Sequence, residues 1–172
     1  SRCDIVKFLP IPSIELKKYL EDRGIDEKKA SILSTFSRGS ISKALELSDS
    51  SDFMIMREDI QNYIQIMLEK NVVDILELPN KLDKYKDNIL EVLDITINYF
   101  RDIMMIKENI DKSMIINIDK ITYLQNMSKK INYSQVSKII DIIEETKKKL
   151  RSNCNFNLSV QVMALNIYEV IK

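Results

Sequence analysis

The sequence is short of the residues on which most enzymes depend. Its 172 residues include no histidine and no tryptophan, only two glycines, three prolines and two cysteines. Without histidine the chain can form neither a Ser-His-Asp triad nor an imidazole metal site. Two cysteines, Cys3 and Cys154, are too few for a four-ligand zinc site or a disulfide framework. So little glycine and proline also excludes the many tight turns of an all-β sandwich or barrel.

The chain also lacks an excess of charge of either sign. Its 26 Lys and Arg residues balance 26 Asp and Glu residues, so the net charge is zero. Because a protein that grips DNA with its own surface is usually clearly basic, we expect any DNA contact to be weak or indirect. No apolar run approaches the roughly 18 residues of a membrane span. With no signal-peptide pattern and no paired cysteines, we expect a cytoplasmic chain without membrane contact.

What the sequence does have is helical periodicity, which predicts an all-α fold. Up to residue 50, three short amphipathic segments follow good N-cap residues, Ser13, Asp26 and Ser40, and two of these come after a glycine. We therefore predict a small three-helix bundle. The side chains predicted to point inward in its first two helices are Ile14, Leu16, Leu20, Ala30, Leu33 and Phe36.

The run of Ser and Asp over residues 48–52 has the composition of a linker, so we predict two domains, 1–50 and 51–172. Beyond the linker, longer apolar stripes predict a bundle of five to six helices. The predicted helices are residues 53–70, residues 72–78 ended by Pro79, residues 88–108, one capped by Asp119, one capped by Ser134, and residues 157–171. In the last helix we expect Leu158, Val162, Leu165 and Tyr168 to point inward.

The start of the chain is different in character. Apolar residues alternate over residues 4–9 before Pro10 and Pro12, which predicts one short extended segment. A lone strand cannot satisfy its own backbone hydrogen bonds. We therefore expect that the chain continues a longer protein, with the rest of a sheet upstream.

Four motifs occur in an order that points to a known family. Ser1-Arg2-Cys3 precedes the extended segment, and residues 38–45 read Arg-Gly-Ser-Ile-Ser-Lys-Ala-Leu. Residues 99–103 read Tyr-Phe-Arg-Asp-Ile, and residues 150–155 read Leu-Arg-Ser-Asn-Cys-Asn. This order resembles the clamp-loader AAA+ proteins of DNA replication, in which a Ser-Arg-Cys motif leads from the core ATPase domain into a helical lid and then a collar. The resemblance covers essentially the whole chain and implies a lid over residues 1–50 and an oligomerising collar over residues 51–172.

The resemblance implies one catalytic role, for Arg2. In this family the arginine of that motif is an arginine finger that reaches the ATP of a neighbouring subunit, a task that suits a planar cation that stays protonated. The alternative is a solvated terminal charge. Ser42, with Lys43 beside it, stands where ATP-hydrolysing members carry a sensor arginine, so the resemblance implies a subunit that does not hydrolyse ATP. The chain has no phosphate-binding Gly-x-x-x-x-Gly-Lys loop, so we expect no cofactor in it and ATP only on its neighbours. The resemblance implies that the family's cysteine zinc module lies upstream, so we also expect no metal here.

The pair Arg101–Asp102 leaves two interpretations open. One is a surface ion pair. The other is a polar contact buried between neighbouring collars, with Tyr99 and Ile103 completing a second buried face. The implied partners are the gamma/tau and delta subunits of a loader and, indirectly, the sliding clamp. Three rivals remain: the ATP-hydrolysing gamma/tau subunit itself, a stand-alone helical interaction module, and a direct DNA-binding protein.

Overall fold

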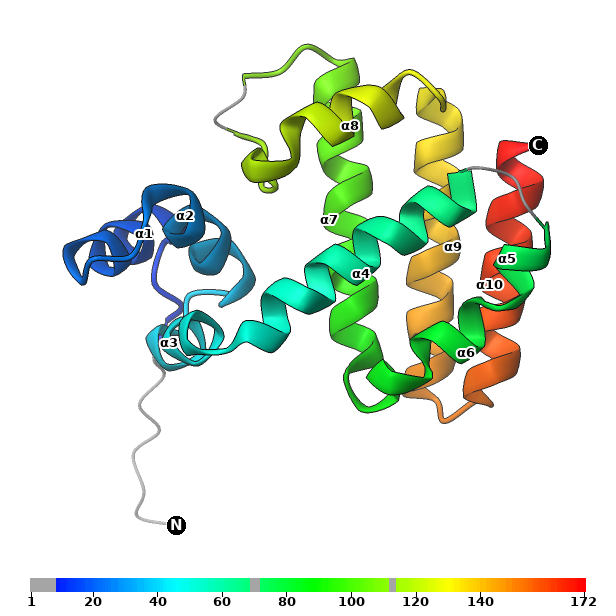
Figure 1. Ribbon diagram of the computed structural model, residues 1–172, viewed down its shortest axis with the longest axis horizontal. Coiled ribbons are helices and arrows are strands. Elements are labelled where there is room, and N and C mark those ends of the chain that lie inside the picture. The colour runs from blue at the N-terminus through cyan, green and yellow to red at the C-terminus, as the bar shows by residue number, and fades with distance from the viewer. Residues whose placement is uncertain (1–8, 69–71, 112–113) are drawn as a thin grey trace. The chain divides into compact units, whose positions relative to one another are not determined.

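The computed structural model describes residues 9–68, 72–111 and 114–172, and throughout these residues the regular structure is helical (Figure 1). The predicted all-α class is confirmed. The extended segment predicted over residues 4–9 lies outside the described residues, except for Leu9, which belongs to no helix. The chain divides into two compact units, Ser1–Met54 and Ile55–Lys172. None of the described helices has the length and apolar character needed to cross a membrane.

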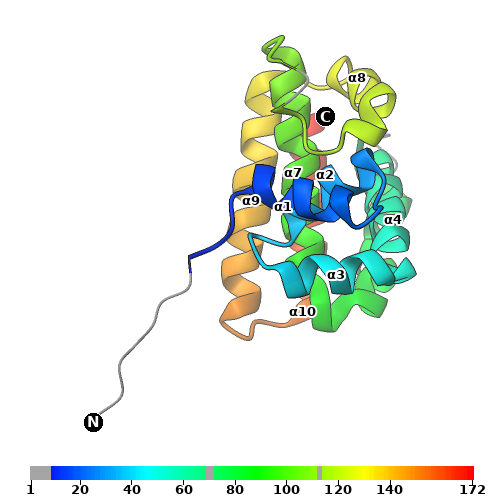
Figure 2. The same ribbon diagram turned by 90° about the vertical axis from the view of Figure 1, so that its left-hand side faces the viewer.

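The first unit is built from α1 (Ser13–Asp22), α2 (Glu27–Phe36) and α3 (Ile41–Asp49), all labelled in Figure 2. Two predicted N-caps are confirmed. The carboxylate of Asp26 accepts hydrogen bonds from the backbone N–H groups of Lys28 and Lys29, and the Ser40 hydroxyl accepts one from that of Lys43. The buried apolar side chains of these three helices are Leu16, Leu20, Ala30, Ile32, Leu33, Phe36 and Ala44.

The start of α1 differs from the prediction. Pro12 occupies the cap position and Ser13 is the first helical residue. Ile14, which was predicted to point inward, is 82% exposed. The reason is geometric: Leu16 and Leu20 lie one turn apart and already form the buried stripe of this short helix, and Ile14 lies off that stripe.

Gly39 lies in the turn before α3 and packs against Pro10 and Ile11, which precede α1. Its φ of +80° is a left-handed conformation, and a Cβ added there would lie 2.5 Å from the Cβ of Pro10 and 2.7 Å from the backbone nitrogen of Ile11. The Ile11 N–H donates a 3.1 Å hydrogen bond to the Gly39 carbonyl. Because both the conformation and the space exclude a side chain, only glycine fits this turn.

The second unit is a helical bundle in which α7, α9 and α10 run side by side and α4 crosses over α7 (Figures 1 and 2). Its elements are α4 (Ser51–Leu68), which begins in the first unit, α5 (Val72–Leu76), α6 (Leu78–Leu82), the 3-10 helix η1 (Asp83–Asn88), α7 (Ile89–Lys107), the 3-10 helix η3 (Ile118–Lys120), α8 (Ile121–Ser128), α9 (Tyr133–Arg151) and α10 (Phe156–Ile171). The predicted stripe of α4 is confirmed, because Ile60, Ile64 and Met67 are all buried.

Three predicted helix boundaries are wrong. Pro79 does not end a helix but lies in the first turn of α6, where the missing N–H costs nothing. Lys120, and not Asp119, occupies the cap position of α8. Ser134 is likewise not a cap, because α9 begins after Asn132, which forms a capping box with Gln135.

The inward face of α10 is also different from the prediction. Leu158 is 60% exposed and Val162 is 38% exposed. The buried residues of this helix are Phe156, Ser159, Val160, Met163, Ala164, Ile167 and Ile171. The helix carries apolar residues on two faces, and packing against α9, α5 and α6 selects the wider one.

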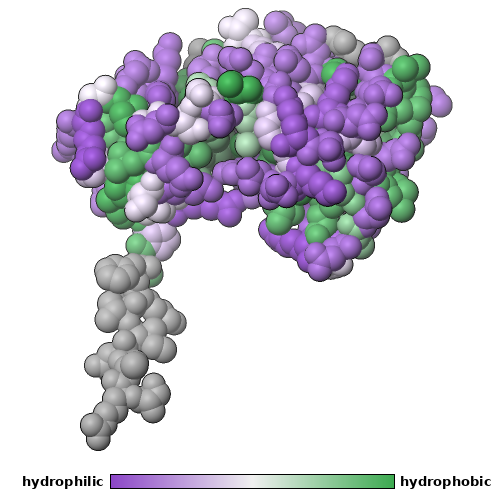
Figure 3. All heavy atoms as spheres, turned by 60° about the horizontal axis from the view of Figure 1, so that its bottom comes forward, coloured by the Kyte–Doolittle hydropathy of each residue, from purple (hydrophilic) through white to green (hydrophobic). Residues whose placement is uncertain are grey.

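On the face drawn in Figure 3, hydrophilic residues predominate and hydrophobic ones show in separate patches.

Candidate functional site

The start of α3 holds the residues predicted at the sensor position. Ser42 is exposed in the first turn of the helix, and Lys43, which is half-buried, bonds through its backbone N–H to the Ser40 hydroxyl. The preceding Arg38 and Gly39 both have positive φ, 52° and 80°, so the chain turns sharply into the helix. Over its whole length, Ile41–Asp49, α3 contains no arginine. The helix therefore offers a hydroxyl and an ammonium group, but no guanidinium, at this position.

Arg2, the predicted arginine finger, lies outside the described residues. Its role in a neighbour's ATP site stays a prediction.

The residues predicted at an interface with another subunit are mostly interior. Tyr99 and Ile103 are fully buried and Asp102 is 1% exposed, all within the second unit. The prediction that these three side chains meet a neighbouring protein is therefore wrong, because their own chain already covers them. Arg101 is exposed and remains available for such a contact. Neither interpretation of the Arg101–Asp102 pair describes Asp102, which is buried but bound by its own chain.

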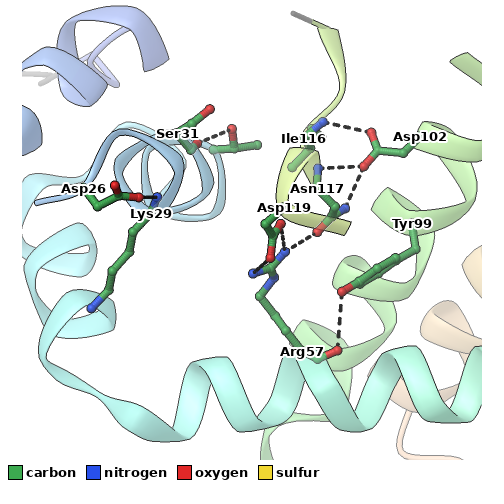
Figure 4. A network of polar contacts seen from close by, with 10 residues as sticks. Asp26, Lys29, Ser31, Arg57, Tyr99, Asp102, Ile116, Asn117 and Asp119 are labelled. Atoms are coloured by element: carbon green, nitrogen blue, oxygen red, sulfur yellow. Dashed lines mark hydrogen bonds and ion pairs between the residues drawn. The ribbon is translucent and has the colours of Figure 1, made fainter. Parts of the chain in front are cut away.

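Asp102 binds the connector, which is residues 114–120 before α8 (Figure 4). Its Oδ1 accepts a 3.0 Å hydrogen bond from the Ile116 N–H. Its Oδ2 accepts two from Asn117, one from the backbone N–H at 2.8 Å and one from the side-chain Nδ2 at 2.7 Å. Burial raises the pKa of Asp102 above its ordinary value, although these N–H donors and the positive charge of Arg57 oppose the increase. One carboxylate thus fixes two consecutive residues of the connector to α7.

Arg57 continues the network on α4. It is 1% exposed, and its guanidinium binds Asp119, with Nη2 2.9 Å from Oδ1 and Nη1 3.2 Å from Oδ2. The same Nη2 donates a 2.8 Å hydrogen bond to the Asn117 Oδ1. The Tyr99 hydroxyl donates to the Arg57 carbonyl at 3.4 Å, and burial raises the pKa of Tyr99 to about 12. Charged and polar side chains from α4, α7 and the connector therefore bind one another inside the unit.

The sequence analysis missed Arg57, although a signal was present. Phe53, Ile60 and Ile64 are apolar at helical spacing, and Arg57 stands on the same stripe, one turn after Phe53. A cation on a buried stripe must be paired, which predicts a carboxylate partner elsewhere in the chain. Periodicity alone cannot identify Asp119 as that partner, because it lies 62 residues away along the chain.

The chemistry of this network is structural. Apart from that of Asp119, which is partly exposed, its side chains are buried, and they are hydrogen-bonded to one another. In the part of the chain that the structure describes, no group of three His, Cys, Asp or Glu residues could hold a metal ion. The arrangement fixes the connector and α8 to α4 and α7.

Comparison with known proteins places this chain in a family. The family model described as "DNA polymerase III, delta subunit, C terminal" matches residues 51–167, from the first residue of α4 into the last turns of α10. A search of curated proteins gave no match. The matched segment covers more than half of the chain and includes the whole Arg57–Asp102 network. The chain therefore belongs to the family of C-terminal domains of the DNA polymerase III delta subunit and is part of a clamp loader.

Proposed function

We propose that the chain is the lid and collar of a delta-prime subunit, a non-hydrolysing arm of the bacterial clamp loader. In this role it assembles with the gamma/tau and delta subunits in the cytoplasm and helps load the sliding clamp within the DNA polymerase III holoenzyme. The observation that carries the proposal is the family match over residues 51–167, preceded in the same chain by the Ser-Arg-Cys motif and the α3 helix.

The second unit supports a role in assembly over a role in catalysis. Inside it, Asp102 holds the connector and Arg57 holds Asp119. A unit that is fixed internally in this way can present a constant outer surface to its neighbours. We assign no contact with a neighbouring protein to the buried Tyr99, Asp102 and Ile103; Arg101, exposed on α7, stays a candidate for one.

The first unit supports the non-hydrolysing assignment. Ser42 replaces the arginine that ATP-hydrolysing relatives place in this helix, and α3 contains no arginine elsewhere. Lys43 supplies a positive charge without the planar fork that matches phosphate oxygens. In the proposed role ATP is bound by neighbouring subunits, and Arg2 completes one of those sites in trans.

A second candidate is the delta subunit, because the matched family is described by that name. The gamma/tau subunit is a weaker candidate, since Ser42 occupies the sensor position. The delta-prime assignment requires that the Arg2 side chain acts on a neighbour's ATP, and Ser42 at the sensor position is what separates this assignment from the gamma/tau subunit.

The test is the substitution Arg2→Ala in the full-length protein, reconstituted with the other loader subunits. Because an arginine finger stabilises charge in the transition state, clamp-dependent ATP hydrolysis should fall while the complex still assembles. Arg2→Lys should not restore the rate, since lysine lacks the planar fork. Arg23→Ala is the matched control. Arg23 is the exposed C-cap residue of α1, and its guanidinium lies over the ring of Tyr19 in the same helix. An ATPase rate that Arg2→Ala leaves unchanged would contradict the proposal.

A further inference from the structure

A strip of apolar side chains runs along the outer face of α10, the helix at the edge of the row α7, α9 and α10 in Figure 1. Leu158, Val162 and Leu165 are spaced by four and three residues, so they lie on one face of the helix. Leu158 is 60% exposed, Val162 is 38% exposed and Leu165 is half-buried. The face that packs against α9, α5 and α6 consists of other residues. The helix therefore has a second apolar face, directed away from the core of its unit.

The outer face of α10 also lacks charge. Residues 152–168 include no Lys, Arg, Asp or Glu, in a chain of which 30% is charged. The neighbouring helix α9 is different, because its exposed face carries Lys138, Asp141 and Glu145. Charged residues are depleted at the centres of protein–protein interfaces and are common on surfaces that stay in water. By composition, the outer face of α10 is an interface, whereas that of α9 is a surface that stays in water.

The lack of charge restricts what could cover the strip. A phosphate backbone, or an acidic or basic segment, would bring charges against apolar side chains, where the charges lose hydration and gain no partner. An apolar protein surface loses little hydration on contact, and both surfaces gain from being removed from water. The chemistry of the strip therefore favours an uncharged, apolar face of a protein.

The length of the strip argues against a second copy of this chain as the occupant. From Leu158 to Leu165 the helix rises by only about 10 Å. A stable interface between two proteins buries about 800 Å² on each partner, which three side chains over that length cannot supply. So small a contact persists where other contacts in the same assembly hold the two surfaces close together. A complex of several subunits provides such contacts, and this chain belongs to a clamp-loader family.

We propose that Leu158, Val162 and Leu165 contact an apolar face on the helical C-terminal domain of a neighbouring loader subunit. This inference rests on the proposed function, to which it adds the surface that makes the contact. It takes the place of the interface predicted around Tyr99, which is buried inside its own unit.

Charged substitutions in the strip test the contact, with the intact 172-residue chain and purified gamma/tau and delta subunits. Leu158→Glu and Val162→Lys should each weaken binding by about tenfold or more, because a charge buried at the contact has no partner there. Leu158→Met keeps an apolar side chain of similar size and should bind like wild type. The matched controls on the exposed face of α9, Lys138→Glu and Asp141→Lys, should also bind like wild type.

Urea unfolding separates a lost contact from a lost fold. Position 158 lies in the first turn of α10, where an acidic side chain favours the helix, and Val162 is exposed. Both charged variants should therefore unfold at a urea concentration close to that of wild type.

The outcomes distinguish this inference from the proposed function. A wild-type chain that does not bind the other subunits would contradict the proposed function and this inference with it. A wild-type chain that binds, together with strip variants that bind equally well, would overturn this inference alone, as would equal losses in the α9 controls. A chain that is dimeric on its own by light scattering, and monomeric as Leu158→Glu, would overturn it by assigning the strip to a second copy.

Discussion

At the scale of single residues, Asp102 contributes most to the order of the second unit. Its two oxygens accept three N–H groups from Ile116 and Asn117, and two of these donors are backbone groups that cannot move away independently. A buried donor that loses its acceptor retains its full desolvation cost. Position 102 therefore requires a group that accepts these hydrogen bonds, and not only a side chain of that size.

Asp102→Asn should lower the free energy of unfolding by about 1–3 kcal/mol. The amide has nearly the shape of the carboxylate, but it offers one acceptor oxygen and turns an NH2 group toward N–H donors. Urea unfolding at pH 7 measures the difference. Asp141→Asn, on the exposed face of α9, is the control and should change the free energy by less than about 0.5 kcal/mol. Equal effects from the two variants would mean that the bonds to the connector add no stability.

The same residue predicts a dependence on pH. Burial raises the pKa of Asp102 in the folded protein above the ordinary value of 3.8. The folded state therefore holds this proton more tightly than the unfolded state, and the resulting stability is complete below pH 3.8 and is lost as pH rises through the folded pKa. Because Asp102→Asn cannot titrate, the difference in unfolding free energy between wild type and variant should decrease over that range. Unfolding curves from about pH 3 upward measure it, and a difference that increases with pH would show that the hydrogen bonds to the carboxylate outweigh its burial.

At the scale of elements, α4 is joined to the connector by the fork of Arg57. Arg57→Met should cost about 1–3 kcal/mol, because it leaves the buried Asn117 Oδ1 without its donor, while the partly exposed Asp119 carboxylate can be hydrated. Asp119→Asn in the same chain should restore part of that loss, with a coupling energy of about 0.5–3 kcal/mol in a double-mutant cycle. Lys17 and Glu27, an exposed pair 3.0 Å apart, provide the comparison and should couple by less than about 1 kcal/mol. Additive effects at Arg57 and Asp119 would contradict the geometry.

At this scale, the features that could be predicted from the sequence depend on residues that are close together along the chain. Asp26 and Ser40 cap their helices as predicted, because an N-cap depends on residues two and three positions away. The inward face of α10 could not be predicted, because Leu158 and Val160 are equally apolar and only the positions of α5, α6 and α9 decide between them. The burial of Tyr99 could not be predicted for the same reason, because α4, which its side chain contacts, comes from elsewhere in the chain.

At the scale of the whole molecule, the chain has no histidine and no net charge, and the structure shows how its charged side chains are used. The charged side chains inside the second unit are used to fix elements to one another, as Lys147 of α9 also does by pairing with Asp94 of α7. In the proposed role its neighbours carry the ATP, and the chain contributes Arg2 and a helical surface for assembly.

Assembly with the other proteins of the loader is the central claim, and it can be measured directly. The 172-residue chain, mixed with purified gamma/tau and delta subunits from the same source, should elute with them from a size-exclusion column. Light scattering should then give a mass that includes one copy of the chain in each complex. A chain that elutes alone at about 20.1 kDa, with the other subunits unaffected, would contradict its place in the clamp loader.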